Sequence, residues 1–152
     1  MPRFEMLTHV AASPERVFEA SLSVDVHTAS FGRSGERAVS GVTSGLLTLG
    51  DQVTWEARHF GLRWRLTSLI SACEAPSFFV DEQTAGPFRR FRHEHRFAAD
   101  GDGTLMRDVV EFASPLGVLG AVADAVVLRR YLARLISVRN EHLKAFTEAG
   151  TS

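Results

Sequence analysis

The chain has 152 residues, of which 45% are hydrophobic and 23% charged, and its formal net charge is −1. This is the composition of a globular protein rather than of a disordered or fibrous one, and the length predicts a single domain over residues 1–150. The near-neutral charge gives no electrostatic reason to expect a nucleic acid as a partner.

Cys73 is the only cysteine of the chain. An intramolecular disulfide and a four-thiolate zinc site are therefore excluded, and a reducing compartment fits this cysteine usage. The first residues lack the basic start and apolar core of a signal peptide, and no stretch reaches the roughly 18 apolar residues of a membrane span. We therefore predict a cytoplasmic protein without integral membrane association.

The N-terminal part of the chain predicts one strand followed by two short helices. Residues 4–11 form a β-like run. Ser13 and Pro14 then mark a helix start, because serine is a preferred N-cap and proline fits the first helical turn. A second short helix is predicted for residues 24–31, and Gly32 ends its pattern.

The middle of the chain, from Arg37 onward, alternates between apolar and polar residues and carries turn residues at strand-length intervals. This pattern predicts six further strands in an antiparallel meander. Because successive side chains point to opposite faces of a strand, the inner face holds every second residue. On the first two long strands the predicted inner residues are Val53, Trp55, Ala57, His59, Trp64, Leu66, Ser68 and Ile70.

A pair of histidines lies in the strand predicted for residues 91–97. Phe91, His93, His95 and Phe97 share one face of that strand, and the charged residues between them lie on the other face. We therefore expect both imidazoles to point to the core side of the sheet.

The C-terminal third returns to a helical pattern after Phe112. Ser114 and Pro115 repeat the helix-start signal, and a largely unbroken helix is predicted to extend toward Phe146. Its apolar positions, spaced three and four residues apart, are Leu128, Leu132, Leu135, Val138, His142 and Phe146. Residues 116–127 are apolar almost all round, which is compatible with a pocket lid or with the contact of a homodimer.

The predicted order is one strand, two short helices, six strands and a long helix. With this order, residues 45–61, 79–88 and 93–95 together with Asp108 resemble a bacterial cyclase-like or ligand-binding subgroup of the START/birch-pollen-allergen/polyketide-cyclase (SRPBCC, helix-grip) superfamily. The likeness covers nearly the whole chain. It implies an α+β fold in which a curved antiparallel sheet of about seven strands wraps around a long C-terminal helix.

The same resemblance implies an elongated cavity between the concave face of the sheet and the long helix. Strand alternation mapped onto that geometry places Trp55, His59, Trp64, Phe91, Val110 and Phe112 on the inner side, and the subgroup's pattern favours Phe79, Asp81 and Gln83 as inward residues. Tyr131 and Leu135 of the long helix complete the expected ligand-binding residues. His27 lies in the segment that forms the pocket mouth in the family, where it either gates the pocket or ties the second short helix to the sheet. No cofactor is implied.

Three interpretations of His93 and His95 are open from the sequence. They bind a metal together with His59 or Asp81, since histidines two apart on a strand share a face. Alternatively, they are buried structural imidazoles that are hydrogen-bonded to neighbouring polar side chains. In the third interpretation they orient a ligand oxygen or move protons. We predict no metal, because this superfamily does not usually need one.

In the proton-transfer interpretation, His93, His95 and Asp108 are the candidate catalytic residues. His95 with Asp108 or Asp81 is the pair to test first, since a carboxylate fixes the tautomer of an imidazole and raises its basicity. The substrate is then a polyketide-type molecule with an enolisable carbonyl group. The sequence alone does not decide whether the protein is an enzyme.

The leading functional hypothesis is the binding of a small hydrophobic molecule, such as a lipid, an isoprenoid or a polyketide-like compound. The alternatives are a metal-free polyketide cyclase, aromatase or dehydratase, and a cochaperone-like protein-interaction module on the same scaffold. Two groups of arginines, within residues 89–96 and 129–134, are interpreted as solvated faces, and alternatively as a patch for an acidic carrier protein or a membrane surface.

Overall fold

The computed structural model describes residues 2–31, 35–114 and 124–150. The first elements are β1 (Arg3–Val10), α1 (Pro14–Ser21), α2 (Val24–Ser30), β2 (Arg37–Gly41), β3 (Gln52–His59) and β4 (Leu62–Glu74). They are followed by β5 (Phe78–Ala85), β6 (Arg90–Asp100), β7 (Gly103–Ala113), the short π-helix η2 (Asp124–Leu128) and the helix α4 (Arg129–Ala149). The predicted order of strands and helices is therefore confirmed.

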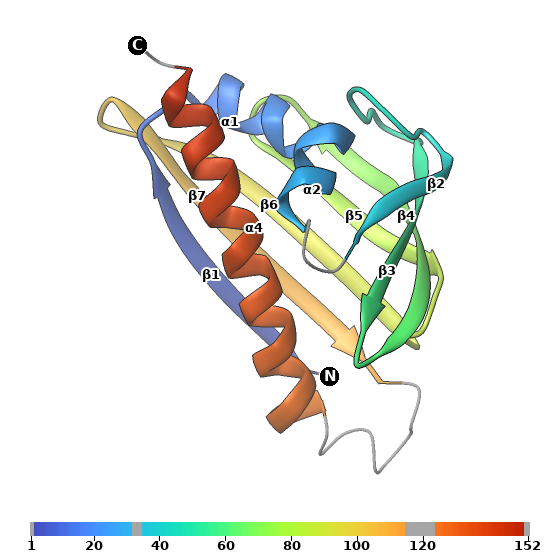
Figure 1. Cartoon of the computed structure of the whole chain (residues 1–152). Coiled ribbons are helices and arrows are strands. Elements are labelled where there is room, and N and C mark those ends of the chain that lie inside the picture. Colours follow the sequence, from blue (N-terminus) through green and yellow to red (C-terminus); the bar gives the residue numbers. More distant parts are fainter. Residues whose placement is uncertain (1, 32–34, 115–123, 151–152) are drawn as a thin grey trace.

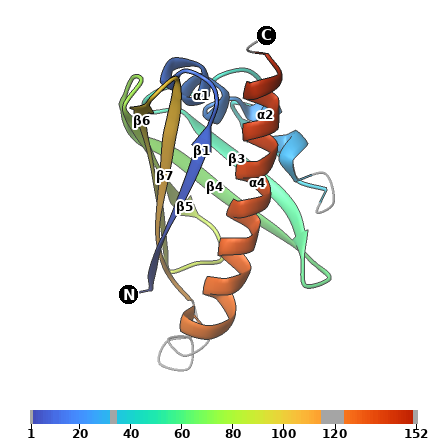
Figure 2. The ribbon, with the colours of Figure 1, turned by 90° about the vertical axis from the view of Figure 1, so that its left-hand side faces the viewer.

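The seven strands form one antiparallel sheet in the order β1-β7-β6-β5-β4-β3-β2. The helix α4 runs across one face of this curved sheet, and α1 and α2 lie over the upper end of the same face (Figure 1; Figure 2). The β3–β4 turn, the β5–β6 turn and the start of α4 lie at the opposite, lower end (Figure 1). This is the α+β helix-grip fold that the sequence predicts.

Both short helices begin at a serine N-cap. The hydroxyl of Ser13 accepts a hydrogen bond from the backbone N–H of Arg16 at 3.3 Å, and that of Ser23 accepts one from Val26 at 3.2 Å. Pro14 occupies the first turn of α1, where its missing N–H leaves no hydrogen bond unmade. These local signals explain why two helices interrupt the chain directly after the first strand.

The hydrophobic core lies between the helices and the sheet in two clusters. The larger cluster includes Val10, Val17, Phe18, Val24, Val53, Phe79, Phe97, Met106 and Leu143. The smaller cluster, under the first turns of α4, consists of Phe4, Val110, Phe112 and Leu132. Phe18 of α1 meets Phe79 and Phe97 edge to face, with ring centroids 5.8 and 5.5 Å apart, and so fixes α1 on the sheet.

The inner face of α4 differs from the predicted apolar stripe. Val138 and Phe146, two of the predicted apolar positions, are 48% and 49% exposed and do not belong to the buried face. The buried residues of the helix are Leu132, Arg139, Asn140, Leu143 and Thr147. Hydrophobic periodicity misses this face because polar side chains occupy three of its five buried positions. Arg139 and Asn140 bond to Asp108 on the sheet, and the Thr147 hydroxyl donates to the helix carbonyl of Leu143.

Part of the predicted C-terminal helix lies outside the described residues. These are its predicted start at Pro115 and most of the apolar segment 116–127, the candidate for a lid or a homodimer contact. Among the residues that the structure describes, no helix combines the length and the apolar character that are needed to cross a bilayer.

Candidate functional site

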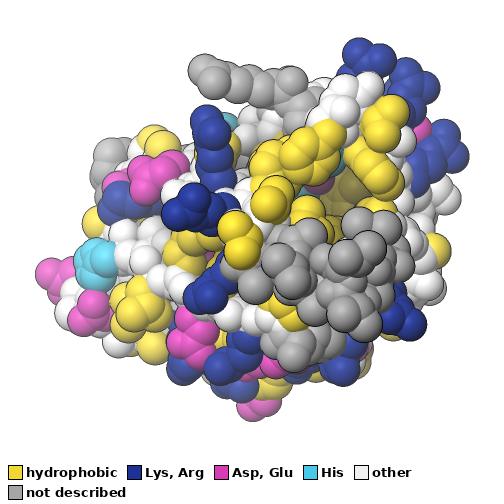
Figure 3. Space-filling model, turned by 90° about the horizontal axis from the view of Figure 1, so that it is seen from below, with side chains coloured by type: hydrophobic (Ala, Val, Ile, Leu, Met, Phe, Trp, Pro, Cys, Tyr) yellow, Lys and Arg dark blue, Asp and Glu magenta, His cyan; other side chains and the backbone are white. Residues whose placement is uncertain are grey.

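A cavity of about 500 Å³ lies between the sheet and α4. This volume is typical of small-molecule binding sites. Its wall is mostly apolar and is built by side chains from α2, α4 and the strands β3 to β6. Seen from below, hydrophobic side chains border a hollow at the lower end of the molecule (Figure 3).

Most of the residues predicted for the site lie in the wall of this cavity. They are His27, Trp55, His59, Trp64, Phe79, Asp81, Phe91, His93, His95, Tyr131 and Leu135. The alternation of the strands therefore identifies the inner face of β3, β4 and β6. That these residues bind a ligand stays a prediction.

Four predicted residues lie outside the cavity wall. The side-chain amide of Gln83 donates to the carbonyl of Phe88 at 2.7 Å, and its oxygen accepts from the Phe88 N–H at 3.2 Å, so Gln83 holds the β5–β6 turn. Val110 and Phe112 point inward but are fully buried in the smaller core cluster. Asp108 is also fully buried, behind the wall. Alternation predicts the face of a residue, but not whether a helix or a cavity covers it.

One polar cluster interrupts the apolar wall. His93 Nε2 is hydrogen-bonded to Asp108 Oδ1 at 2.7 Å, and His95 Nε2 to Asp81 Oδ2 at 2.6 Å. The register pairs His93 with Asp81 and His95 with Asp108, so both hydrogen bonds run diagonally between neighbouring strands. The two imidazole rings stack with their centroids 3.7 Å apart. The strand β6 thus presents two histidines, each held by an aspartate of a flanking strand.

The helix α4 adds a guanidinium and an amide to this cluster, which the sequence analysis missed. Arg139 Nη1 donates to Asp108 Oδ1 at 3.4 Å, and Arg139 Nη2 lies 3.4 Å from His95 Nδ1. Asn140 Nδ2 donates to Asp108 Oδ2 at 2.7 Å. The signal in the sequence is weak: Arg139 stands four residues after Leu135 and therefore on the same side of the helix.

Both carboxylates are ionised at neutral pH. Burial alone would raise the pKa of Asp81, but the hydrogen bond from His95 and nearby positive charges lower that pKa to about 2. Burial is likewise outweighed at Asp108, where the hydrogen bond from His93 and the charge of Arg139 hold the pKa well below its usual range. Burial and the neighbouring His95 lower the pKa of His93, although Asp108 acts in the opposite direction. The imidazole of His93 is therefore neutral at pH 7.

The hydrogen-bond partners assign the tautomers of both histidines. An ionised carboxylate only accepts, so His93 and His95 each donate through Nε2. A guanidinium only donates, so Nδ1 of His95 accepts from Arg139. Nδ1 of His93 has no hydrogen-bond partner among the described residues. Among the described residues, His93 is thus the member of the pair that keeps an unengaged ring nitrogen, and His93 lines the cavity.

Two further histidines connect helices to the sheet at the cavity wall. His59 Nδ1 and the hydroxyl of Tyr131 on α4 are 2.5 Å apart, and burial lowers the pKa of His59. His27 Nε2 lies 2.6 Å from a carboxylate oxygen of Glu36, and its ring centroid lies 4.2 Å from that of Trp55. These contacts match the second predicted role of His27, which ties α2 to the sheet.

The geometry of Asp81, His93 and His95 admits a metal ion by distance alone, since their potential ligand atoms lie within 4.8 Å of one another. The chemistry of the donor set fits less well. His95 Nε2 and Asp81 are bonded directly to each other, and the guanidinium of Arg139 adds positive charge next to His95. The absence of a metal stays a prediction that elemental analysis tests.

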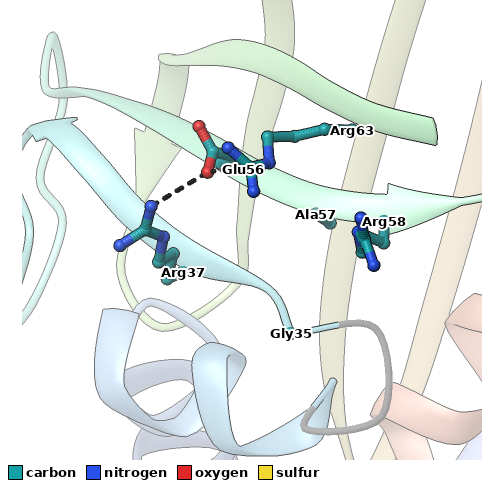
Figure 4. A pocket seen from close by; sticks show the side chains of 6 residues that line it. All are labelled: Gly35, Arg37, Glu56, Ala57, Arg58 and Arg63. Atoms are coloured by element: carbon teal, nitrogen blue, oxygen red, sulfur yellow. Dashed lines mark hydrogen bonds and ion pairs between the residues drawn. The ribbon is translucent and has the colours of Figure 1, made fainter.

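A second, smaller pocket lies on the other side of β3, beside β2 (Figure 4). Glu56 is nearly buried there, because Arg37 at 3.0 Å, Arg65 at 2.8 Å and Arg63 at 3.7 Å surround its carboxylate. Hydrogen bonds from Arg65 and Arg37 lower the pKa of Glu56. One carboxylate is thus shared by three guanidinium groups, and this side of the sheet keeps an excess of positive charge.

The chain has relatives among known proteins. It matches the family model described as "Polyketide cyclase / dehydrase and lipid transport" over residues 1–148. No curated protein matches it. It is similar to the protein TTHA0849 from Thermus thermophilus, with a TM-score of 0.80, 15% identity, and coverage of 99% of this chain and 100% of that one.

Two further solved structures have the same fold. A START superfamily protein from Mycobacterium smegmatis aligns with a TM-score of 0.74 and 14% identity over 98% of this chain and 99% of the other. The major latex-like protein 151 from Panax ginseng aligns with a TM-score of 0.69 and 12% identity over 96% of this chain and 97% of the other. At these identities the structural likeness shows the fold alone.

Proposed function

Because the chain belongs to the polyketide cyclase / dehydrase and lipid transport family, we propose that its cavity binds a small, largely apolar molecule. The ligand class is a lipid, an isoprenoid or a polyketide-like compound that carries a carbonyl or hydroxyl group. The observation that supports this proposal is a cavity of about 500 Å³ whose apolar wall is interrupted by one polar cluster.

The depth of the polar cluster indicates which part of the ligand meets it. Strand β6 begins at its lower end with Arg90. His93 and His95 come three and five residues later, so they lie about 10 and 17 Å along the strand from that end. A ligand that enters at the lower end would reach His93 with a polar group, and its apolar body would lie against Phe91 and Leu135. Burial of apolar surface then supplies affinity, and the polar cluster supplies orientation.

Native mass spectrometry of the purified protein, followed by solvent extraction, tests this proposal. A co-purifying apolar compound supports it and identifies the ligand. A second measurement follows displacement of the fluorescent probe 1-anilinonaphthalene-8-sulfonate. Trp55→Ala and Phe91→Ala should each weaken binding roughly tenfold or more, because each truncates a large apolar side chain of the cavity wall. Leu49→Ala, which truncates a side chain 61% exposed on an upper loop, is the control. No bound compound and no probe binding would together contradict the proposal.

The histidine–aspartate arrangement favours a second candidate function, a metal-free cyclase, aromatase or dehydratase that acts on a polyketide-type substrate. His93 Nδ1 would accept a proton from the carbon next to a carbonyl group, and Asp108 on the opposite ring nitrogen would stabilise the resulting imidazolium. Arg139 would stabilise the enolate as a donor. His95, the first choice from the sequence, is less suited as the base, because both of its ring nitrogens are engaged.

Deuterium exchange next to the carbonyl of a long-chain β-diketone tests the catalytic candidate. His93→Gln should abolish the exchange while binding of the fluorescent probe persists, and His95→Gln should leave part of it. A similar loss of folding stability in both variants, with no exchange in the unmodified protein, would support purely structural histidines instead.

A cochaperone-like interaction module is the third candidate. An exposed apolar groove without a cavity would favour it, and the described residues instead line a cavity. We further propose that residues 1–150 act as one ligand-binding domain in the cytoplasm, where the unpaired thiol of Cys73 would stay reduced. The mass measured under native conditions also tests for a homodimer.

A further inference from the structure

We propose that the lower end of the molecule, around the mouth of the cavity, docks on the surface of an anionic lipid bilayer. This inference goes beyond the binding of a ligand, and its test requires no ligand. It rests on an exposed apolar hairpin, on an unusual residue at the tip of that hairpin, and on the distribution of arginines around it.

The β3–β4 hairpin exposes large apolar side chains at the lower end. Phe60 and Leu62 are 64% and 58% exposed, and Trp64 follows on the same hairpin as a further exposed aromatic residue. Figure 3 shows hydrophobic side chains gathered around the hollow on this face. Single exposed apolar residues are ordinary on protein surfaces, but several large ones on one hairpin beside a cavity form a patch of the kind that contacts a partner.

Phe60 occupies a backbone conformation that disfavours a bulky residue. Phe60 and Gly61 have φ values of 56° and 73° and form the two-residue turn between the paired residues His59 and Leu62. Such turns prefer Asn-Gly, because few other side chains tolerate a positive φ. The ring of Phe60 contacts Tyr131, with centroids 4.6 Å apart, but stays mostly exposed. A residue that is locally unfavourable and adds little to the core indicates a function at the surface.

Arginines outnumber acidic residues around this patch, although Glu56 pairs with Arg63 and Arg65, and Glu94 pairs with Arg92. Residues 57–66, 84–92 and 126–138, which meet at the lower end, each contain three arginines and no aspartate or glutamate. The whole chain has a net charge of −1, so these three segments carry positive charge that other parts of the chain offset. An apolar patch with a rim of arginines complements a bilayer, whose interior is apolar and whose headgroups are anionic.

The position of the patch favours a bilayer over an acidic protein as the partner. An apolar ligand would pass from the acyl chains into the apolar cavity without crossing water, because hairpin and cavity mouth lie on the same face (Figure 3). An acidic protein would be matched by the arginines alone and would not require Phe60 and Leu62 at the tip of the hairpin.

Flotation of the full chain with vesicles tests the proposal, with phosphatidylcholine vesicles either pure or containing about a third phosphatidylglycerol. Binding is expected only with the anionic vesicles and should decrease as salt is added. The variant Arg90→Gln/Arg130→Gln should bind about 25-fold more weakly, since each charge near the surface contributes about fivefold. Neither arginine lines the cavity. The matched control Arg96→Gln/Arg107→Gln removes two charges from the outer face of the sheet and should bind within about twofold of the unmodified chain.

Leu62→Thr tests the apolar part of the surface, since Leu62 lies outside the cavity wall and threonine suits a strand. It should weaken vesicle binding about fivefold or more, whereas Leu49→Thr at the upper end should not. Probe displacement establishes that each variant keeps its cavity. Absence of binding to anionic vesicles at low salt, or equal losses in the control variants, would overturn the proposal. Arginine-dependent binding to an acidic acyl carrier protein without vesicle binding would overturn it in favour of a protein partner.

Discussion

Replacing Asp108 with asparagine removes one charge from the polar cluster and keeps the shape of the side chain. Asp108 is fully buried, and its oxygens lie 2.7 Å from His93, 2.7 Å from Asn140 and 3.4 Å from Arg139. In Asp108→Asn, Arg139 loses its one carboxylate partner among the described residues. Breaking a buried ion pair by removing one partner costs about 3–5 kcal/mol, and we expect a loss of unfolding free energy in this range.

Urea unfolding followed by circular dichroism measures this loss, and a melting curve should shift downward by roughly 6–20 °C for a chain of this length. The control Asp100→Asn, an exposed carboxylate 3.4 Å from His9, should change the free energy by less than about 0.5 kcal/mol. Arg139→Met added to Asp108→Asn should restore part of the loss, because it removes the unpaired charge. A loss below about 1 kcal/mol in Asp108→Asn would refute the reasoning that Asp108 neutralises a buried guanidinium.

Acid should lower the free energy of unfolding in two stages. Because the pKa of His93 is lowered in the folded state, the free energy of unfolding should decrease as the pH drops below about 6.5. Asp81 has a folded pKa of about 2 against the usual 3.8, so the stability that it contributes should be lost as the pH drops from about 4 to about 2. A pH series of urea midpoints that stays flat below pH 6 would contradict this. Elemental analysis of the dialysed protein should find no stoichiometric metal, and stoichiometric zinc or iron would revive the metal interpretation. Leu143→Ala should cost about 2–5 kcal/mol, whereas Val138→Ser and Phe146→Ser should each cost less than about 1 kcal/mol, and the reverse order would contradict the orientation of α4.

The inner faces of the central strands could be predicted because an antiparallel strand with one buried face alternates along its own sequence. Trp55, Trp64 and His95 reach the cavity for this reason. Gln83 is different, since its amide is engaged by a turn whose backbone geometry alternation does not describe. The burial of Arg139 in the polar cluster could not be predicted. A charged residue on a helix is expected to face solvent unless its partner on another element is known.

The pairing inside the polar cluster also depends on the three-dimensional structure, although the sequence predicts its histidines and aspartates. The sequence pairs His95 with Asp108 or Asp81, and His95 lies 2.6 Å from Asp81 and 3.5 Å from Asp108. The register alone would place Asp108 directly opposite His95. The choice of the diagonal partner depends on the ring orientation, which is fixed by packing such as the stacking of Phe79 on His95 at 4.1 Å.

The charges of the buried cluster set limits on the polar group of the ligand. With neutral imidazoles, the carboxylates of Asp81 and Asp108 against the guanidinium of Arg139 leave one uncompensated negative charge. A ligand carboxylate would add a second negative charge in a buried site, whereas the hydroxyl of an enol or alcohol would add none and would donate to His93 Nδ1. The interior therefore suits a neutral polar group. Anionic groups would be matched instead by the arginines outside, so the proposed ligand and the proposed bilayer would meet different parts of the molecule.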